Sequence, residues 1–207
     1  ADWDHKLATG SPAAALWNVW YYRHLGPALS ETLSKDPGTV SPRIDTQTVL
    51  KMLTTEQGQT IASDTLKTAW KETKDLLGDE PGDWQWGDLH KIKFSHPLLS
   101  LAGGDLKAQM TIPEYPRGGS ENTTNNTGYN PDNFLVRSGA SFRMVLDVGN
   151  WDDAKMTNAP GQSGNPGSPY YDNLLKNWAT DSHLPMVYSR ARVEAHKAFT
   201  ITLEPEE

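Results

Sequence analysis

The sequence contains no cysteine, so it can form neither a disulfide framework nor a metal site held by thiolates. Basic residues are also few, because 19 Lys and Arg stand against 26 Asp and Glu and give a formal net charge of −7. A nucleic-acid-binding protein needs a surplus of Lys and Arg in one patch, and this composition argues against that class. No apolar run comes near the length that spans a bilayer.

The residues that are present are typical of a folded protein. Hydrophobic residues make up 36% of the 207 residues and charged residues 22%, a balance found in globular rather than disordered chains. The length suits one large compact domain or a part of a larger protein. Because the chain opens at Ala1, without a Met or a signal-like apolar region, we interpret it as a processed or excised piece.

Residues 1–80 are predicted to form a helical segment. Ser11 followed by Pro12 is a typical pair of N-cap and first-turn residues, and it predicts a helix that continues through Tyr21. The stretch His24–Pro27 is expected to end or kink this helix, since its proline cannot donate a helical hydrogen bond.

Two further helices are predicted in this segment. One begins at Asp45, and the other runs from Ser63 to a stop at Gly78, where glycine can end a helix. Their apolar residues recur at helical spacing and are expected to face the core. The positions expected to be buried are Val49, Leu50 and Leu53 in the first helix, and Leu66, Ala69, Trp70, Thr73, Leu76 and Leu77 in the second.

Residues 81–207 are predicted to form a segment of strands and long loops. Apolar and other residues alternate most regularly in Ser141–Val148, which predicts a strand, and Phe199–Leu203 predicts a closing strand. Glu80–Asp88 is rich in Gly, Pro and Trp, which predicts a loop or short irregular strands. Thr111–Gly139 has few apolar residues and is predicted to be a long surface loop.

Short helices are predicted at Tyr171–Trp178 and Ser189–Ala198, the latter with Ser189 as its cap. Two or three strands cannot easily form an independent sheet without exposed edges. We therefore expect the sheet to be completed by polypeptide outside this chain.

Two short patterns invite comparison with catalytic or metal sites. Gly161–Asn165 reads Gly-Gln-Ser-Gly-Asn and misses the Gly-x-Ser-x-Gly nucleophile elbow at its last position. We interpret it as a turn whose glycines permit positive φ and close backbone approach. Asp88, His90 and His96 lack the spacing and the number of ligands that a metal site needs, so the histidines are interpreted as structural.

The acidic stretch after the first predicted strand resembles a calcium loop only superficially. Asp147, Asn150, Asp152 and Asp153 lack the ligand order and the glycine of an EF-hand, so a solvated turn is predicted. Adjacent carboxylates also cannot face each other across a cleft, as glycoside hydrolysis requires.

The chain has eight tryptophans. Those on helical patterns are expected to pack in a core; they are Trp3, Trp17, Trp20 and Trp70. For the loop residues Trp84, Trp86 and Trp151, core or loop-anchoring roles are favoured over stacking on a sugar or another ligand.

Several of these patterns, in their order along the chain, resemble the closing region of the penicillin acylase family of N-terminal-nucleophile hydrolases. The residues that carry the resemblance are Trp86–His90, Phe94–Leu98, Pro116–Gly119, Gly139–Arg143, Asp147, Pro160–Pro166, Ser168–Asp172, Trp178, Leu184–Met186 and Leu203–Pro205, with the helical opening from Trp3 to Trp20. They cover nearly all of this chain but only the last part of a family member. Tyr170 departs from the pattern, because relatives often have His there.

The resemblance implies a segment of the large subunit of an N-acyl amidase. Such an enzyme transfers the acyl group to an N-terminal Ser whose α-amine is the base, while backbone and Asn donors hold the oxyanion. In the family these groups lie upstream of the residues seen here, and Ala1 has no hydroxyl or thiol. No catalytic residue is therefore carried over, the substrate-binding residues are unknown, and no metal site or cofactor is assigned to this chain. Calcium is implied only through upstream residues.

The resemblance also implies an α+β fold that is part of a four-layer αββα sandwich. The strands Ser141–Val148 and Phe199–Leu203 would join its sheets, and the early helices would cover one side. Arg143 and Asp147 share one face of the first strand and are expected to form structural ion pairs with neighbours. The implied partners are the rest of the acylase, namely the small subunit and the N-terminal part of the large subunit, and a small-molecule amide. The implied location is periplasmic or extracellular.

Two functional hypotheses follow. In the first, the chain is the C-terminal segment of an acylase that hydrolyses penicillins, acyl-homoserine lactones or acylated peptides. In the second, it is a stand-alone secreted binding module whose loop tryptophans stack on sugars or other ligands.

Overall fold

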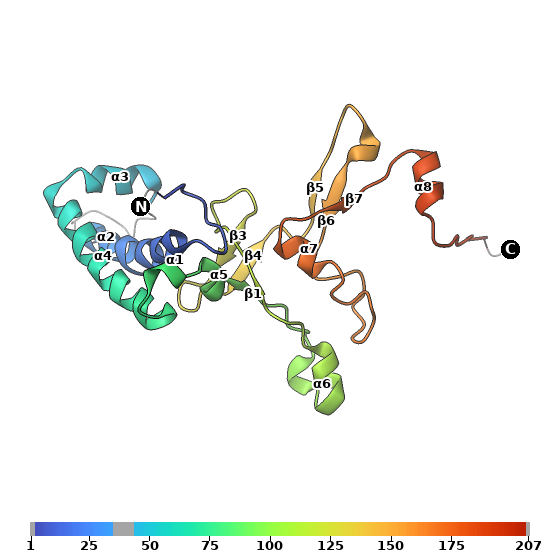
Figure 1. The fold of residues 1–207 in the computed structure, drawn as a ribbon, viewed down its shortest axis with the longest axis horizontal. Coiled ribbons are helices and arrows are strands. Elements are labelled where there is room, and N and C mark those ends of the chain that lie inside the picture. The colour runs from blue at the N-terminus through green and yellow to red at the C-terminus, as the bar shows by residue number, and fades with distance from the viewer. Residues whose placement is uncertain (1–2, 35–43, 206–207) are drawn as a thin grey trace. The chain divides into compact units, whose positions relative to one another are not determined.

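The computed structural model describes residues 3–34 and 44–205, and these belong to two compact units. The first unit comprises Ala1–Lys93 and Pro113–Gly139, and the second comprises Phe94–Ile112 and Ala140–Glu207. Each unit combines helices with one small sheet (Figure 1). The predicted α+β class is therefore confirmed. Neither the predicted division at residue 80 nor the four-layer arrangement is tested by these units, and both stay predictions.

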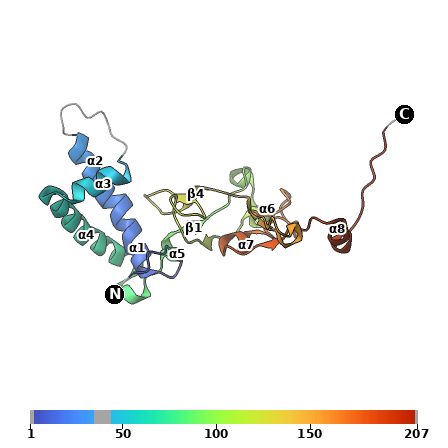
Figure 2. The ribbon, with the colours of Figure 1, turned by 90° about the horizontal axis from the view of Figure 1, so that it is seen from above.

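Helices dominate the first part of the first unit, as the sequence predicts. The described helices are α1 (Pro12–Asn18), the π-helix η1 (Val19–Leu25), α2 (Gly26–Ser34), α3 (Thr46–Leu53), α4 (Glu56–Leu77), the 3-10 turn η2 (Pro81–Asp83) and α5 (Trp86–Leu89). Figure 2 shows α1 to α2 as one continuous blue rod, with α4 packed along it. None of the helices in the described part of the chain is long and apolar enough to span a bilayer.

Side-chain caps explain where three of these helices begin. The Ser11 hydroxyl accepts a hydrogen bond from the backbone N–H of Ala14, and Asp45 accepts one from that of Thr48. Both predicted starts are confirmed, because an N-cap is a local signal. The start predicted at Ser63 is wrong, since α4 already begins after Thr55, whose hydroxyl accepts from the N–H of Gly58.

The sequence predicted that His24–Pro27 ends or kinks the helix, and the predicted end is wrong. The chain stays helical, and the α-helix widens into the π-helix η1 before α2 begins at Gly26. In a π-helix each N–H binds the carbonyl five residues earlier, as the N–H of Gly26 does with Tyr21. Pro27 stands where this pattern changes back to the α-helical one. Its missing N–H therefore does not end the helix.

The stretch Thr111–Gly139, predicted to be a surface loop, supplies most of the sheet of the first unit. The strands are β1 (Lys91–Ile92), β2 (Tyr115–Pro116), β3 (Thr127–Tyr129) and β4 (Val136–Gly139), in the order β2-β1-β4-β3. The strand β1 runs parallel to β4, and the other two pairs are antiparallel. Tyr129 and Phe134 are buried in the core, and because these apolar residues are few, the sequence pattern did not predict a strand. Glu80–Asp88, predicted to be a loop or irregular strand, instead forms η2 and the start of α5.

The core of the first unit lies where the helices meet this sheet. One cluster consists of Ala14, Ala15, Val19, Ala69, Trp86, Tyr129 and Phe134, and a second of Leu25, Leu29 and Val49. Four positions predicted to be buried are instead exposed: Leu50, Leu66, Trp70 and Leu76. Helical spacing shows which residues share a face, but it does not show whether this chain covers that face.

The second unit has the three-stranded antiparallel sheet β5 (Arg143–Val145), β6 (Lys155–Thr157) and β7 (Leu184–Pro185), in that order. Its described helical elements are η3 (Leu99–Leu101), α6 (Gly104–Met110), η4 (Trp151–Asp153), α7 (Leu175–Ala179) and α8 (Arg190–His196). The predicted helix capped by Ser189 is confirmed, because its hydroxyl accepts from the N–H of Arg192. The helix predicted from Tyr171 begins later, at Leu175.

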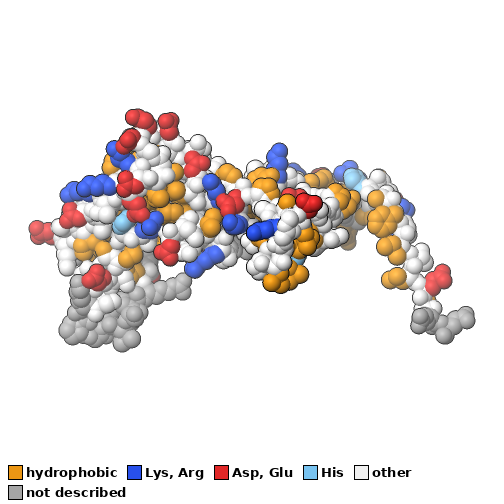
Figure 3. All heavy atoms as spheres, turned by 90° about the horizontal axis from the view of Figure 1, so that it is seen from below, with side chains coloured by type: hydrophobic (Ala, Val, Ile, Leu, Met, Phe, Trp, Pro, Cys, Tyr) orange, Lys and Arg blue, Asp and Glu red, His pale blue; other side chains and the backbone are white. Residues whose placement is uncertain are grey.

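Of the two strands predicted in the second unit, one is present in part and the other is not found in the described structure. Ser141–Val148 contains the short strand β5, but its alternating apolar residues Phe142, Met144, Leu146 and Val148 are 41% to 79% exposed. The strand predicted at Phe199–Leu203 is wrong for the described structure, where this segment pairs with no strand. Its three apolar residues are 72% to 90% exposed. Figure 3 shows a row of apolar side chains along this end of the chain.

We predict that Gly58→Ala destabilises the first unit, although alanine normally stabilises a helix by about 1 kcal/mol relative to glycine. A Cβ on Gly58 would collide with the backbone carbonyl of Met52, where α4 begins against α3. The overpacking should lower the free energy of unfolding by about 1–3 kcal/mol in urea titrations. Gly82→Ala is the control, since its Cβ would meet nothing within 4 Å. An unchanged or increased stability of Gly58→Ala would contradict the packing described here.

Candidate functional site

The residues that carry the family resemblance in the first unit meet at a buried ring pair. Trp86 and His90 stack with their ring centroids 4.6 Å apart and their planes 6° from parallel, and both are fully buried. The indole N–H of Trp86 donates to the carbonyl of Gly119 at 3.0 Å. His90 Nδ1 lies 2.5 Å from the carbonyl oxygen of Arg117, and Nε2 lies 3.1 Å from that of Thr127. We call this arrangement the Trp86–His90 pair.

Two glycines allow the backbone to pass this close to the Trp86–His90 pair. Gly119 has φ of +86°, a conformation that side chains other than glycine rarely adopt, and its N–H donates to the carbonyl of Leu7 at 2.7 Å. A Cβ on Gly118 would lie 2.8 Å from that same carbonyl oxygen. The motif Pro116–Gly119 therefore ties the N-terminal segment to the sheet.

Both ring nitrogens of His90 face backbone carbonyls, so this ring has a structural role, as the sequence predicts. His96 belongs to the second unit, and its Nδ1 accepts from the N–H of Leu98. Asp88 is exposed. Residues 3–34 and 44–205 contain no group of three or more potential metal ligands.

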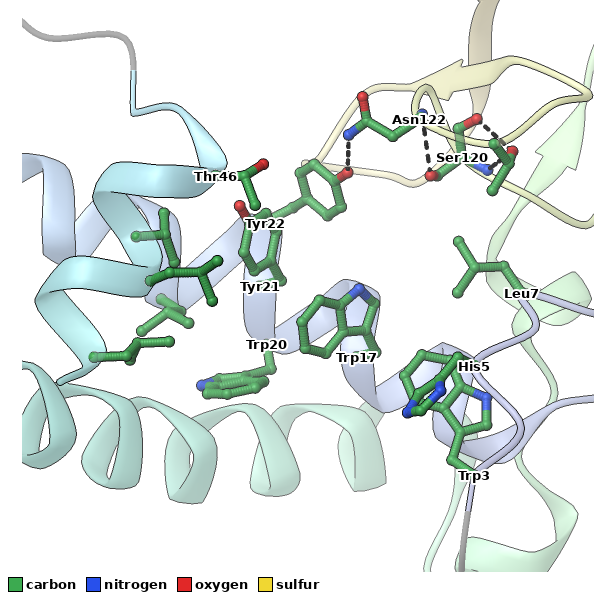
Figure 4. Close-up of a pocket in the computed structure, with 15 residues that line it drawn as sticks. Trp3, His5, Leu7, Trp17, Trp20, Tyr21, Tyr22, Thr46, Ser120 and Asn122 are labelled. Carbon is green, nitrogen blue, oxygen red and sulfur yellow. Dashed lines mark hydrogen bonds between the residues drawn. The ribbon is translucent and has the colours of Figure 1, made fainter.

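Beside the Trp86–His90 pair lies an open aromatic pocket of about 620 Å³ (Figure 4). Its walls come from the N-terminal segment, the rod from α1 to η1, helix α3 and the loop that follows Gly119. The residues that line it are Trp3, His5, Leu7, Trp17, Trp20, Tyr21, Tyr22, Leu25, Thr46, Val49, Leu50, Leu53, Ser120, Asn122 and Thr123. We call it the aromatic pocket.

The rings of the aromatic pocket contact one another in a continuous row. Trp17 stacks on Tyr21 with centroids 5.2 Å apart, meets Trp20 edge to face and contacts the tilted ring of Trp3. The π-helix η1 carries Trp20, Tyr21 and Tyr22 in succession, so its wide turn spreads three rings around the rod. Such π-helical turns occur frequently at functional sites.

Some polar groups of the aromatic pocket form hydrogen bonds with the described residues, and others do not. Asn122 Nδ2 donates to the Tyr22 hydroxyl at 3.2 Å, and the Trp20 indole N–H donates to the Thr65 hydroxyl at 3.0 Å. Burial raises the pKa of Tyr21 and Tyr22, and the nearby Glu121 carboxylate acts in the same direction. Their hydroxyls therefore stay protonated at neutral pH. Within the described part of the chain, the Trp17 indole N–H and the Tyr21 hydroxyl form no hydrogen bond.

A half-buried polar cluster holds the rod against α4. The Glu72 carboxylate accepts from Arg23 Nη1 at 2.8 Å and lies 2.5 Å from His24 Nε2. The Arg23 guanidinium also lies 5.3 Å from the centre of the Phe134 ring. All three side chains already contact one another, which indicates a structural role in positioning η1.

In the second unit the predicted ion pair of Arg143 is confirmed. Its Nη1 lies 2.7 Å from Asp181 Oδ1, and its guanidinium lies over the Trp178 ring at 4.3 Å. Asp147 forms no such pair with the residues that the structure describes, and it instead accepts hydrogen bonds from the N–H groups of Gly149 and Asn150. The predicted turn is therefore present.

The remaining candidates also serve structure. Asp152 accepts from the N–H groups of Tyr188 and Ser189, and Asn150 donates to Asp153. These contacts close the turn.

Close backbone approach, predicted for Gly161–Asn165, is confirmed at Gly161. A Cβ there would collide with the carbonyl oxygens of Tyr170 and Tyr171. Positive φ is found at neither glycine of the motif. Ser163 Oγ only accepts from the N–H of Asn165.

The loop tryptophans do not form a ligand platform. Trp84 and Trp86 are buried, and only Trp151 is exposed, where its ring lies 5.9 Å from that of Tyr188. The loop-anchoring interpretation is confirmed for the two buried residues.

Sequence reasoning missed the aromatic pocket because it assigned Trp3, Trp17 and Trp20 to a core. The available signal was the run Trp20–Tyr22, since three consecutive rings cannot all face one core.

The described residues contain no pair of a hydroxyl and a histidine ring of the kind found in serine hydrolases. Across residues 3–34 and 44–205, no Ser or Thr hydroxyl forms a hydrogen bond with a histidine ring. Ala1, which the sequence excludes as a nucleophile, lies outside the described residues. What the first unit offers is a rigid ring pair and an uncharged aromatic pocket.

Comparison with known sequences gives a consistent result. The family model described as penicillin amidase matches residues 1–195. Penicillin acylase 2 proenzyme of Pseudomonas sp. (strain SE83) is 28% identical over 98% of this chain, and the match covers 28% of that protein. Acyl-homoserine lactone acylase QuiP of Pseudomonas syringae pv. syringae is 33% identical over 59% of this chain. QuiP of Pseudomonas aeruginosa is 27% identical over 76% of it. These two matches cover 15% and 20% of the relatives.

We predict that acid destabilises the first unit through His90. Burial lowers the pKa of His90 from 6.5 to about 4, although the two carbonyls favour the charged ring. The unfolded chain therefore takes up a proton at a higher pH than the folded chain does. Stability from this group is complete above about pH 6.5, decreases by about 3 kcal/mol as the pH falls to about 4, and then levels off.

This pH dependence can be measured by urea unfolding between pH 8 and 4. In His90→Gln the free energy of unfolding should decrease much less over this pH range. In His196→Gln, which removes an exposed histidine, it should decrease as in the unchanged protein. Because His90→Gln also loses the stack on Trp86, NMR of the His90 ring in the unchanged protein supplies a second measurement. A ring that becomes protonated above pH 6 would refute the assignment.

Proposed function

Because this chain belongs to the penicillin amidase family, we propose that it is the C-terminal part of an acylase that hydrolyses a linear amide. The acyl group is transferred to an N-terminal Ser of the same enzyme, located in polypeptide outside this chain. Penicillins, acyl-homoserine lactones and acylated peptides are the proposed substrates. The observation that carries the proposal is the family match over residues 1–195.

The relatives support the reaction class and the partial coverage. Two of them are named as a penicillin acylase and an acyl-homoserine lactone acylase, and both names denote removal of an acyl group from an amide nitrogen. The chain spans about a quarter of the length of the first and less of the second. The nucleophile, its α-amine base and the oxyanion donors are then expected from the remaining polypeptide.

In this proposal the chain supplies scaffold rather than reacting groups. The exposed apolar faces of Ser141–Val148 and Phe199–Leu203 are the surfaces through which it would complete the sheets of an αββα sandwich. A strand with an uncovered apolar face gains free energy when a second layer packs on it. The Trp86–His90 pair would hold the loop after Gly119 in place within this scaffold.

Further parts of the proposal follow from the family and not from the residues of this chain. The partners are the small subunit and the N-terminal part of the large subunit. Calcium, if the enzyme holds it, binds through residues outside this chain. The location is periplasmic or extracellular. The alternative of a sugar-binding module has lost its main support, because Trp84 and Trp86 are buried.

The proposal is tested by producing the complete polypeptide that contains this chain. Mass spectrometry should find, beside a chain that contains these residues, an N-terminal Ser generated by cleavage. The purified protein should release free amine from a penicillin, an acyl-homoserine lactone or an acyl-peptide, and replacing that Ser by Ala should abolish hydrolysis. Release of the same amines by the 207-residue chain alone, or no hydrolysis by the complete protein, would refute the proposal.

A further inference from the structure

We propose that the aromatic pocket binds an uncharged apolar peptide segment. This segment belongs to the part of the acylase polypeptide that lies outside this chain. An apolar side chain of the segment would pack against the stacked rings of Trp17 and Tyr21 and against Leu50. A backbone carbonyl of the segment would accept a hydrogen bond from the pocket. This inference rests on the proposed function, which makes the chain one part of a longer acylase.

The lining of the aromatic pocket disfavours an anionic occupant. Among its fifteen lining residues there is no Lys or Arg, and His5 is the single imidazole. A bound carboxylate would lose its hydration here without gaining an opposite charge. Anionic small molecules are therefore poor occupants.

The aromatic pocket nevertheless has hydrogen-bond donors to offer. The Trp17 indole N–H and the Tyr21 hydroxyl have no hydrogen-bond partner in the described part of the chain, and Trp17 and Tyr21 stack on each other at one wall. A peptide segment combines apolar side chains with backbone carbonyl acceptors. It therefore satisfies both the rings and the donors.

An exposed apolar side chain lies at one rim of the aromatic pocket. Leu50 is 59% exposed, while Val49 beside it on α3 is buried. An exposed leucine alone is ordinary, but an exposed leucine that continues a concave aromatic surface indicates an interaction site. The residue was predicted to be buried from its helical spacing, and a docked segment would bury it.

The walls of the aromatic pocket are already fixed before any segment docks. Asn122 holds Tyr22, Thr65 holds Trp20, and the Gly119 N–H holds the segment that carries Leu7. A preformed site saves the free energy of ordering its own side chains when a partner binds.

The remainder of the acylase polypeptide is the best source of the occupant. The match to penicillin acylase 2 covers 28% of that protein, so most of a protein of that length would lie outside the residues seen here. A segment of the same enzyme is present at high effective concentration, and even a short apolar stretch can then occupy an open pocket. A second copy of this chain lacks this advantage.

The test uses the complete acylase and the absence of cysteine from this chain. Leu50→Cys places one thiol at the rim of the aromatic pocket. Gln47→Cys is the matched control, because it is an exposed position of the same helix that does not line the pocket. The alkylation rate of each thiol is measured by mass spectrometry of its peptide, in the folded enzyme and after unfolding in urea.

A docked segment should slow the alkylation of Leu50→Cys at least about 30-fold on folding, and that of Gln47→Cys by less than about 5-fold. A photoreactive cross-linker on the same thiol should then attach to a peptide of the same molecule outside these 207 residues. Equal reactivity at both positions would overturn the inference, because the pocket would be open. A cross-link to a second copy of the chain would also overturn the inference. Protection of the thiol that appears only when an acyl substrate is added would overturn it as well.

Amide hydrolysis measured on the same samples separates the two proposals. An active enzyme with a freely reactive Leu50→Cys refutes the docked segment and leaves the acylase assignment intact. An inactive protein without an N-terminal nucleophile refutes the assignment on which the inference rests.

Discussion

The first unit depends on the stacking of Trp86 on His90 inside a ring of backbone carbonyls. The indole and the imidazole together bind three segments: the turn at Arg117–Gly119, the strand β3 at Thr127 and their own helix α5. Full burial of an imidazole is costly unless its N–H finds an acceptor. The neutral His90 ring has one N–H, which the carbonyl of Arg117 or that of Thr127 can accept.

The turn that contacts this ring pair also positions parts of the aromatic pocket. The turn at Gly119 fixes the segment of Leu7 on one side and begins the loop of Asn122 on the other. The turn that binds the Trp86–His90 pair therefore also positions two walls of the aromatic pocket. The aromatic wall comes from η1, whose position on α4 is set by Glu72 and its two basic partners. A structural motif thus determines the geometry of the open surface beside it.

The sequence predicted best what depends on neighbouring residues alone. Ser11, Asp45 and Ser189 each cap a helix, because a side chain that accepts from an N–H three residues ahead needs no distant partner. The sheet of Thr111–Gly139 could not be predicted in this way. Its strands are short, and they pair because α5 and the Trp86–His90 pair bring them together. The same limit explains the missed aromatic pocket, which no local pattern defines.

The burial errors that came from periodic apolar patterns share a direction. Leu50, Phe142 and the alternating residues of Phe199–Leu203 were all predicted to be buried or paired, and all are exposed in this chain. A periodic apolar pattern states which face is to be covered but not which polypeptide covers it. Under the proposed function these faces meet the rest of the acylase. The patterns then describe burial in the complete enzyme, of which this chain would be one part, and the exposed faces mark where the other parts would pack.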